Sequence, residues 1–191
     1  MTPITNRGVG TFSSTGKFKA QGNIMSLLFG ADFKGKTDLT GKSYAFYNLF
    51  SSNSNLVNVQ NLSLPATTLA ESCYDSMFYG CTSLVNAPTL PATTLAVYCY
   101  QNMFNGCTSL VKAPTLPATT LEYSCYQFMF DGCTKLSYIK CLATKISASS
   151  LSNWVNGVAS SGTFVKDANM TSWTTGISGI PTGWTVQDVT V

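Results

Sequence analysis

The chain contains no histidine, and only 10% of its 191 residues are charged. Without histidine, the Ser-His-Asp and Cys-His nucleophile systems and histidine-ligated catalytic zinc are excluded. The net charge of +3 lies mostly in the N-terminal quarter and is too sparse for a nucleic-acid-binding stripe. No run of about 18 apolar residues is present, so the sequence predicts no membrane span.

Other kinds of site are missing as well. The chain has no phosphate-binding glycine motif and only eight acidic residues, so a glycosidase pair of carboxylates would have to meet across neighbouring repeats. We therefore predict a protein that is not an enzyme, with no cofactor and no metal. Residues 1–7 lack the apolar core of a secretory signal, so we expect a removed signal or another delivery route.

Internal repetition is what the sequence has in abundance. The segment Leu64–Leu69, LPATTL, recurs at 90–95 and at 116–121, with a period of 26 residues. Each copy is followed by one frame, in which Cys-Tyr, Met-Phe and Gly-Cys-Thr alternate with variable residues. Repeats of this length are typical of solenoids, in which each unit buries its apolar face against its neighbours.

The repeats divide the chain into three predicted parts. Degraded copies flank the three clear repeats, which predicts a solenoid over residues 44–162. Alternating polarity over 8–20 and an apolar run at 24–29 predict a hairpin with a capping element within residues 1–43. Residues 163–191, which contain Trp173 and Trp184, are predicted to form a β-rich C-terminal cap. The clear repeats are 64–89, 90–115 and 116–141.

Within each repeat we predict one short strand and one short helix. Residues 110–116 have the apolar spacing of a short strand, whereas Leu95, Cys99 and Met103 recur at helical spacing. A preceding threonine can cap a helix over 95–104, and Gly106 is placed to end it. The predicted fold class is an α/β solenoid.

The cysteines follow the repeat, because two columns of it carry cysteine in every clear copy. We predict buried thiols that stack in ladders, and disulfides such as Cys73–Cys81 are the alternative in an oxidising compartment. An odd count leaves at least one unpaired thiol in a monomer. Tight CxxC pairs are absent, so no zinc site is expected. The seven residues are Cys73, Cys81, Cys99, Cys107, Cys125, Cys133 and Cys141.

The frame Phe-x-Gly-Cys-Thr-x-Leu at 78–84, 104–110 and 130–136 resembles the BspA-like branch of leucine-rich repeats. The LPATTL segment and the ending from Trp173 to Trp184 look like a subtype found in gut bacterial surface proteins and their phages. The resemblance covers roughly residues 44–184. It implies a right-handed solenoid with a parallel sheet on one side and, more loosely, a role in adhesion or host recognition.

The variable columns of the repeat provide candidate binding residues. Their variation is explained either by neutral drift on a solvated face or by a recognition patch, since exposed aromatic rings among Asn and Asp suit sugar or protein contacts. The aromatic residues in these columns are the candidate ligand-binding residues. They are Tyr79, Tyr98, Tyr123, Phe128 and Tyr138.

These observations favour a non-enzymatic recognition or adhesion module that binds a protein or glycan on a cell surface, as part of a phage virion or of a bacterial surface. The expected location is therefore the extracellular surface or a virion. The alternative is a structural or assembly subunit with no ligand-binding role. Self-association through the ends of the solenoid is expected as a further interaction.

Overall fold

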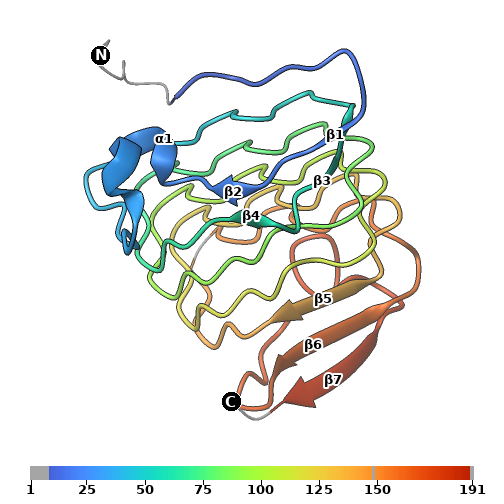
Figure 1. Cartoon of the computed structure of the whole chain (residues 1–191). Helices are drawn as coiled ribbons and strands as arrows, with labels where there is room; N and C mark the ends of the chain where they lie inside the picture. Colours follow the sequence, from blue (N-terminus) through green and yellow to red (C-terminus); the bar gives the residue numbers. More distant parts are fainter. Residues whose placement is uncertain (1–8, 148, 190–191) are drawn as a thin grey trace.

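The computed structural model describes residues 9–147 and 149–189. The chain winds in successive coils that lie one above another, from the blue N-terminal part to the red C-terminal part (Figure 1). Parallel bridges join the coils, since Asn86 pairs with Asn58 on one side and with Lys112 on the other. Lys112 pairs in turn with Tyr138, 26 residues further on, so the coil length equals the sequence period.

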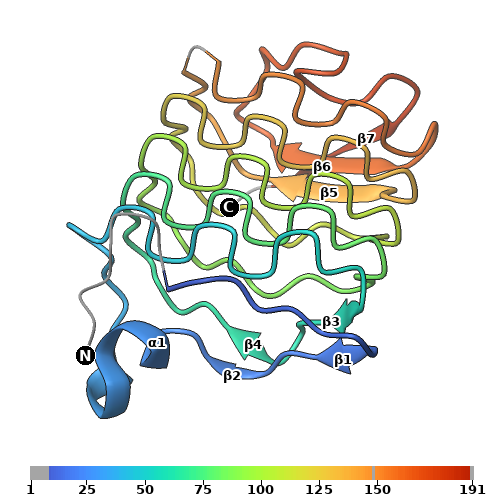
Figure 2. The same ribbon diagram turned by 90° about the horizontal axis from the view of Figure 1, so that it is seen from above.

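The N-terminal part contains short elements that pair with the second coil. Strand β1 (Phe18–Lys19) pairs in parallel with β3 (Leu56–Asn58), and β2 (Gly22–Asn23) pairs in parallel with β4 (Leu62–Ser63). Helix α1 (Ser26–Phe29) and the 3-10 helix η1 (Gly30–Phe33) follow β2. Figure 2 shows α1 beside the first coils, at the end of the stack where β1 and β2 lie.

The opposite end of the stack contains a regular parallel sheet. Strands β5 (Tyr138–Cys141), β6 (Thr163–Asp167) and β7 (Thr185–Val189) lie in the order β5-β6-β7, and β7 is the last strand. Because β6 pairs with β5, the sheet continues across residue 162, where the sequence suggested the start of a separate cap.

The hairpin predicted within residues 1–43 is wrong, because β1 and β2 pair with the second coil rather than with each other. The segment from residue 9 to residue 24 is itself a coil, in which the Phe12 N–H donates to the Leu49 carbonyl at 2.8 Å. An alternation of polar and apolar residues is expected for any strand with one buried side, whichever strand it pairs with. Here stacking on the second coil buries the apolar side and supplies the backbone hydrogen bonds, so no hairpin is needed.

The predicted helix in each repeat is also wrong, since the described helical elements are α1 and η1 alone. Residues 95–104 form a run of turns, in which Tyr98, Asn102 and Gly106 have φ of 57°, 52° and 73°. One left-handed residue in every four prevents an α-helix. Apolar residues at every fourth position therefore have the spacing of a helix although the chain forms turns.

The turn runs satisfy their backbone groups between coils. The Met103 N–H donates to the Tyr100 carbonyl of its own coil at 3.2 Å, whereas the Phe104 N–H donates to the Met129 carbonyl of the next coil at 2.9 Å. The same alternation recurs through the clear repeats. A single unit would leave every second amide without a partner, so each coil depends on its neighbour.

The core consists of columns of matching side chains. Phe78 stacks on Phe50 and Phe104 with ring centroids 5.6 and 5.5 Å apart, and a second column runs through Tyr74, Tyr100 and on to Trp154. These rings are almost completely buried. Offset stacking adds to the free energy gained from burying their apolar area.

The cysteines lie in this core as seven free, buried thiols, which confirms the prediction of shielded thiols. The Cys107 Sγ donates to the Phe78 carbonyl of the preceding coil at 3.1 Å, and Cys133 repeats this contact with Phe104 at 3.0 Å. Cys141 stands outside both cysteine columns, because it pairs with Leu116 in the strand ladder. Burial raises the pKa of the Cys141 thiol to about 12.

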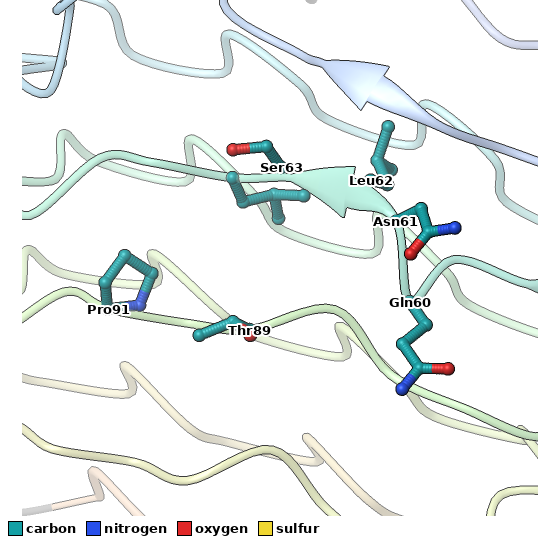
Figure 3. A pocket seen from close by; sticks show the side chains of 7 residues that line it. Gln60, Asn61, Leu62, Ser63, Thr89 and Pro91 are labelled. Atoms are coloured by element: carbon teal, nitrogen blue, oxygen red, sulfur yellow. The ribbon is translucent and has the colours of Figure 1, made fainter.

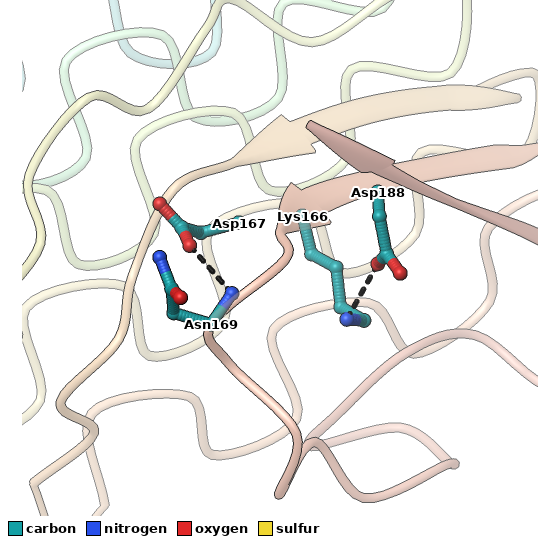
Figure 4. A network of polar contacts seen from close by, with 4 residues as sticks. All are labelled: Lys166, Asp167, Asn169 and Asp188. Carbon is teal, nitrogen blue, oxygen red and sulfur yellow. Dashed lines mark hydrogen bonds and ion pairs between the residues drawn. The ribbon is translucent and has the colours of Figure 1, made fainter. Parts of the chain in front are cut away.

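Two tryptophans and an ion pair close the C-terminal end. Trp173 stacks on Trp154 at 6.1 Å, and the Trp184 Nε1–H donates to the Ala159 carbonyl at 2.7 Å. Lys166 follows the buried Cys141 in the strand ladder, and its Nζ lies 2.6 Å from the Asp188 carboxylate of β7 (Figure 4). The core therefore ends in charged side chains on this side.

Among the described residues, every helix is too short and too polar to cross a membrane. The right-handed sense of the coil and the leucine-rich-repeat assignment stay predictions.

Candidate recognition surface

The stacked turn runs present one continuous face, which we call the turn face. It comprises the outward side chains of residues 43–52, 71–80, 97–106 and 123–132. The Tyr44 N–H donates to the Glu71 carbonyl at 3.0 Å, and the Tyr98 N–H donates to the Tyr123 carbonyl at 3.2 Å. Because such bonds align each run with the next, variable columns of the repeat become rows of neighbouring side chains.

Two of the predicted binding residues meet on the turn face. The rings of Tyr98 and Tyr123 pack edge to face with centroids 5.6 Å apart, and Tyr123 is 47% exposed. The pKa of Tyr98 is raised by loss of solvent around its phenol, by the Tyr123 phenol and by the nearby Glu71 and Tyr44. Tyr98 and Tyr123 therefore form an aromatic cluster, and Glu71 and Tyr44 lie on the turn runs of the two preceding coils.

Tyr79 and Phe128 share the turn face but belong to other columns. Tyr79 is 43% exposed. Phe128 is half-buried and adopts a φ of 54°. Among the described aromatic pairs, neither ring packs against Tyr98 or Tyr123. They therefore extend the aromatic surface without joining the cluster.

Tyr138 lies elsewhere, at the start of β5 in the strand ladder. The Lys112 Nζ lies 4.6 Å from the centroid of its ring, which is the geometry of a cation–π contact. The five predicted residues therefore do not form one patch.

Tyr44 and Tyr47 also lie on the turn face, although the variable columns of the repeat did not point to them. Their rings pack edge to face at 6.0 Å on the second coil. This copy of the repeat is degraded, and Tyr47 resembles the buried tyrosine of the clear copies. The structure instead stacks Phe46 on Tyr74 at 5.4 Å, so Tyr47 faces outward. The sequence did contain a signal for this arrangement. Phe50 aligns with Phe78, so Phe46, four residues before Phe50, aligns with the buried Tyr74.

A row of polar side chains crosses the middle of the turn face. The Gln101 Nε2 donates to the Gln127 Oε1 of the next coil at 2.7 Å. In the preceding coil the equivalent position is Asp75, which is only 8% exposed and accepts from the Ser76 hydroxyl at 2.7 Å. Burial raises the pKa of the Asp75 carboxyl to about 6, against hydrogen bonds from Ser76 and Asn102. The row supplies neutral donors and acceptors and one acid that protonates readily.

A polar notch lies where the second coil carries two more residues than the clear repeats. Two additional residues near Gln60 make the chain bulge, and the Gln60 N–H donates to the Asn58 Oδ1 at 2.7 Å. The notch has a volume of about 280 Å³. Figure 3 shows the side chains of Gln60 and Asn61 on one side of it and those of Thr89 and Pro91, from the next coil, on the other. The notch carries amides and hydroxyls but no charge.

The described residues offer little for catalysis. Among them, no three potential metal ligands converge. Burial raises the pKa of the Cys73 and Cys133 thiols to about 12, so these thiols are protonated at neutral pH and are poor nucleophiles. What the surface can do is make contacts through rings, amides and hydroxyls.

Comparison of the chain with known protein families, with curated proteins and with solved structures finds no match.

Proposed function

We propose that this protein is a non-enzymatic recognition module of the leucine-rich-repeat type, which binds a protein or a glycan on a cell surface as part of a virion or of a bacterial surface. The observation that carries the proposal is the aromatic cluster of Tyr98 and Tyr123 on the turn face, whose rings pack edge to face with centroids 5.6 Å apart. Exposed tyrosines provide large contact areas with few rotatable bonds, and their hydroxyl groups add hydrogen bonds.

The scaffold beneath the cluster also supports this proposal. Backbone hydrogen bonds hold the aromatic residues in neighbouring coils, and stacked buried rings support them from below. A surface held in place in this way loses little conformational entropy on binding. The polar row of Gln101, Gln127 and Asp75 lies along the same runs and offers hydrogen-bonding groups beside the rings.

The test is to screen the full chain on a glycan array and against host-cell surface proteins, and then to compare two variants. We expect the double variant Tyr98→Ala/Tyr123→Ala to weaken binding at least about tenfold, as the loss of two central aromatic contacts does at interfaces. Tyr138→Ala is the matched control, because it removes a tyrosine from another face. Equal loss in both variants, or a failure of the whole screen to find a ligand, would count against the proposal.

The second candidate function is a structural or assembly subunit without a ligand. It is favoured by the edge of β1 and β2, on which no other described strand pairs. Static light scattering on the full chain at rising concentration separates the candidates, since an assembly subunit associates and a chain that stays strictly monomeric does not support this role.

A further inference from the structure

The first coil leaves an apolar groove open at the N-terminal end of the stack. The groove has a volume of about 380 Å³. Its floor is formed by Leu49, Phe50 and Leu62, and its walls come from the first coil and α1. The side chains that form these walls include Phe12, Phe18, Ala20, Ile24 and Leu27.

The groove exists because nothing in the described chain covers the first coil. Phe12 stacks on Phe50 at 5.4 Å but is 49% exposed, whereas Phe78 lies between two rings and is fully buried. Ala20 and Gly22 provide almost no side chain, and Gly22 pairs with the much larger Leu62 of the second coil. An added strand with apolar side chains would therefore bind in a groove that is already formed.

The backbone of the first coil presents a strand edge beside this groove. The N–H groups of Phe18, Ala20 and Gly22 donate to carbonyls of the second coil at 3.0 to 3.1 Å. Peptide groups alternate in direction along an extended strand, so those of Lys19 and Gln21 point away from the second coil. Such an edge is a template for an added strand.

The charge around the groove is positive. Residues 12–27, which form the groove walls, contain Lys17 and Lys19, both exposed, and no acidic residue. Lys19 lies in the edge strand itself and Lys17 directly precedes it. Positive charge at the edge favours a partner with acidic side chains.

A second copy of this chain fits the groove poorly. The opposite end of the stack carries Lys166 and Asp188 in a core column, and an added rung would bury that ion pair at a desolvation cost. Charged side chains on the last strand of a sheet protect its edge from pairing. Two N-terminal ends facing each other would bring both sets of lysines together.

We infer that the N-terminal groove binds an extended segment of another protein, in which acidic and apolar residues alternate. The segment adds as a strand to the outer edge of β1 and β2. Its apolar side chains enter the groove beside Ala20 and Gly22, and its acidic side chains lie on the outer side with Lys17 and Lys19. Backbone pairing gives affinity, and the alternation of side chains gives specificity.

The experiment uses fluorescein-labelled octapeptides and the full chain, with binding read as fluorescence anisotropy. The probe alternates Leu with Asp, and the two matched peptides alternate Leu with Lys and Ser with Asp. We expect the Leu/Asp peptide to bind at least about tenfold more tightly than either matched peptide. Raising the salt concentration from about 0.05 to 0.5 M should weaken its binding.

Two variants locate the site. Lys17→Glu/Lys19→Glu and Leu27→Asp should each weaken binding of the Leu/Asp peptide at least about tenfold, because they reverse the charge at the edge or place an acid in the groove wall. Lys135→Glu is the control, since it reverses an exposed charge away from the groove. All three side chains to be changed at the groove are exposed, so folding should survive, and circular dichroism checks this.

Three results would overturn the inference. They are equal binding of the Leu/Asp and Leu/Lys peptides, binding that Lys17→Glu/Lys19→Glu leaves unchanged, and a dimer of the chain itself that the same variant dissociates. The last result would show a second copy in the groove. The inference does not depend on the turn face, so Tyr98→Ala/Tyr123→Ala should bind the Leu/Asp peptide normally.

Discussion

The two ends of the stack finish the same core in different ways. At the N-terminal end, Phe12 and Leu27 remain exposed around an open apolar groove, and the edge of β1 and β2 is free of any described strand. At the C-terminal end, Trp173 covers the last buried ring, and Lys166 and Asp188 place charge where the next core residue would lie.

Different side chains therefore bury the end of a core and prevent an added strand from pairing at its edge. The tryptophans bury apolar area, which stabilises the last coil. The ion pair contributes little to stability but makes an added strand costly. Among the residues that the structure describes, the N-terminal end has neither feature, so its edge and its groove are available together.

The largest expected effect on stability comes from replacing an aromatic residue at each end of the stack. Trp173→Ala should lower the free energy of unfolding by about 2 kcal/mol, because it uncovers Trp154 and Phe164. Phe12→Ala should cost less than about 1 kcal/mol, since half of this ring is already exposed. Urea titrations of both variants measure the difference. Equal costs would mean that the two ends are equally well covered.

Charge offers a second contrast, between the middle of the stack and its C-terminal end. Asp75 is buried and its pKa is raised to about 6 by burial, so its ionised form destabilises the folded state. Asp75→Asn should therefore raise the free energy of unfolding at pH 7.5 by about 1 to 2 kcal/mol. Asp188→Asn should lower it by less than about 1 kcal/mol, because it breaks an ion pair at the surface.

The Asp75 effect has a defined pH dependence. A raised pKa in the folded state means that the penalty is absent below the unfolded pKa and grows as the pH rises through the folded value. The gain from Asp75→Asn should thus be complete above about pH 7 and vanish near pH 4. Urea unfolding at both pH values checks this, and a gain that persists unchanged at pH 4 would rule out ionisation as its cause.

Removing the block at the C-terminal edge should change association more than stability. Lys166→Met/Asp188→Val replaces this terminal ion pair by apolar side chains, which should leave the free energy of unfolding within about 1 kcal/mol of its original value. The variant should associate at concentrations where the unchanged protein does not, because its edge now accepts a strand. Light scattering measures this. The single variant Asp188→Asn serves as control, since it keeps the edge polar.

The smallest effect tests the central column of rings. The Tyr74 hydroxyl is buried without a hydrogen-bond partner, and Phe46 occupies the same column in the preceding coil. Tyr74→Phe should therefore leave the free energy of unfolding unchanged or raise it by about 1 kcal/mol. Tyr126→Phe is the comparison within the same column. A clear loss of stability in Tyr74→Phe would show that its hydroxyl has a partner in solution.

Periodicity alone predicted a good part of this molecule. The exact recurrence of the LPATTL segment set the length of the coils in the clear repeats, and the invariant Cys and Met-Phe positions identified buried columns. The conformation between them was not predictable in the same way. Residues 95–104 have the apolar spacing of a helix. They form turns instead, because every second amide donates to a carbonyl of the next coil.

The candidate surface was predictable in part for a related reason. Variable columns pointed to Tyr98 and Tyr123, because residues free of packing constraints vary between copies. Tyr44 was not identified because its copy of the repeat is degraded. Tyr138 also lies in a variable column, but it belongs to the strand ladder and not to the turn face. Sequence variation tells which side chains are free, whereas the fold decides which of them meet.

The coil period, the buried columns and the lack of histidine chemistry follow from the amino-acid sequence, because they depend on which residue types recur and at what spacing. That the repeats form turns and that the first segment stacks in parallel is settled by the tertiary structure. It alone also decided that the two ends differ, because backbone groups and apolar faces find their partners in neighbouring coils and not within one repeat.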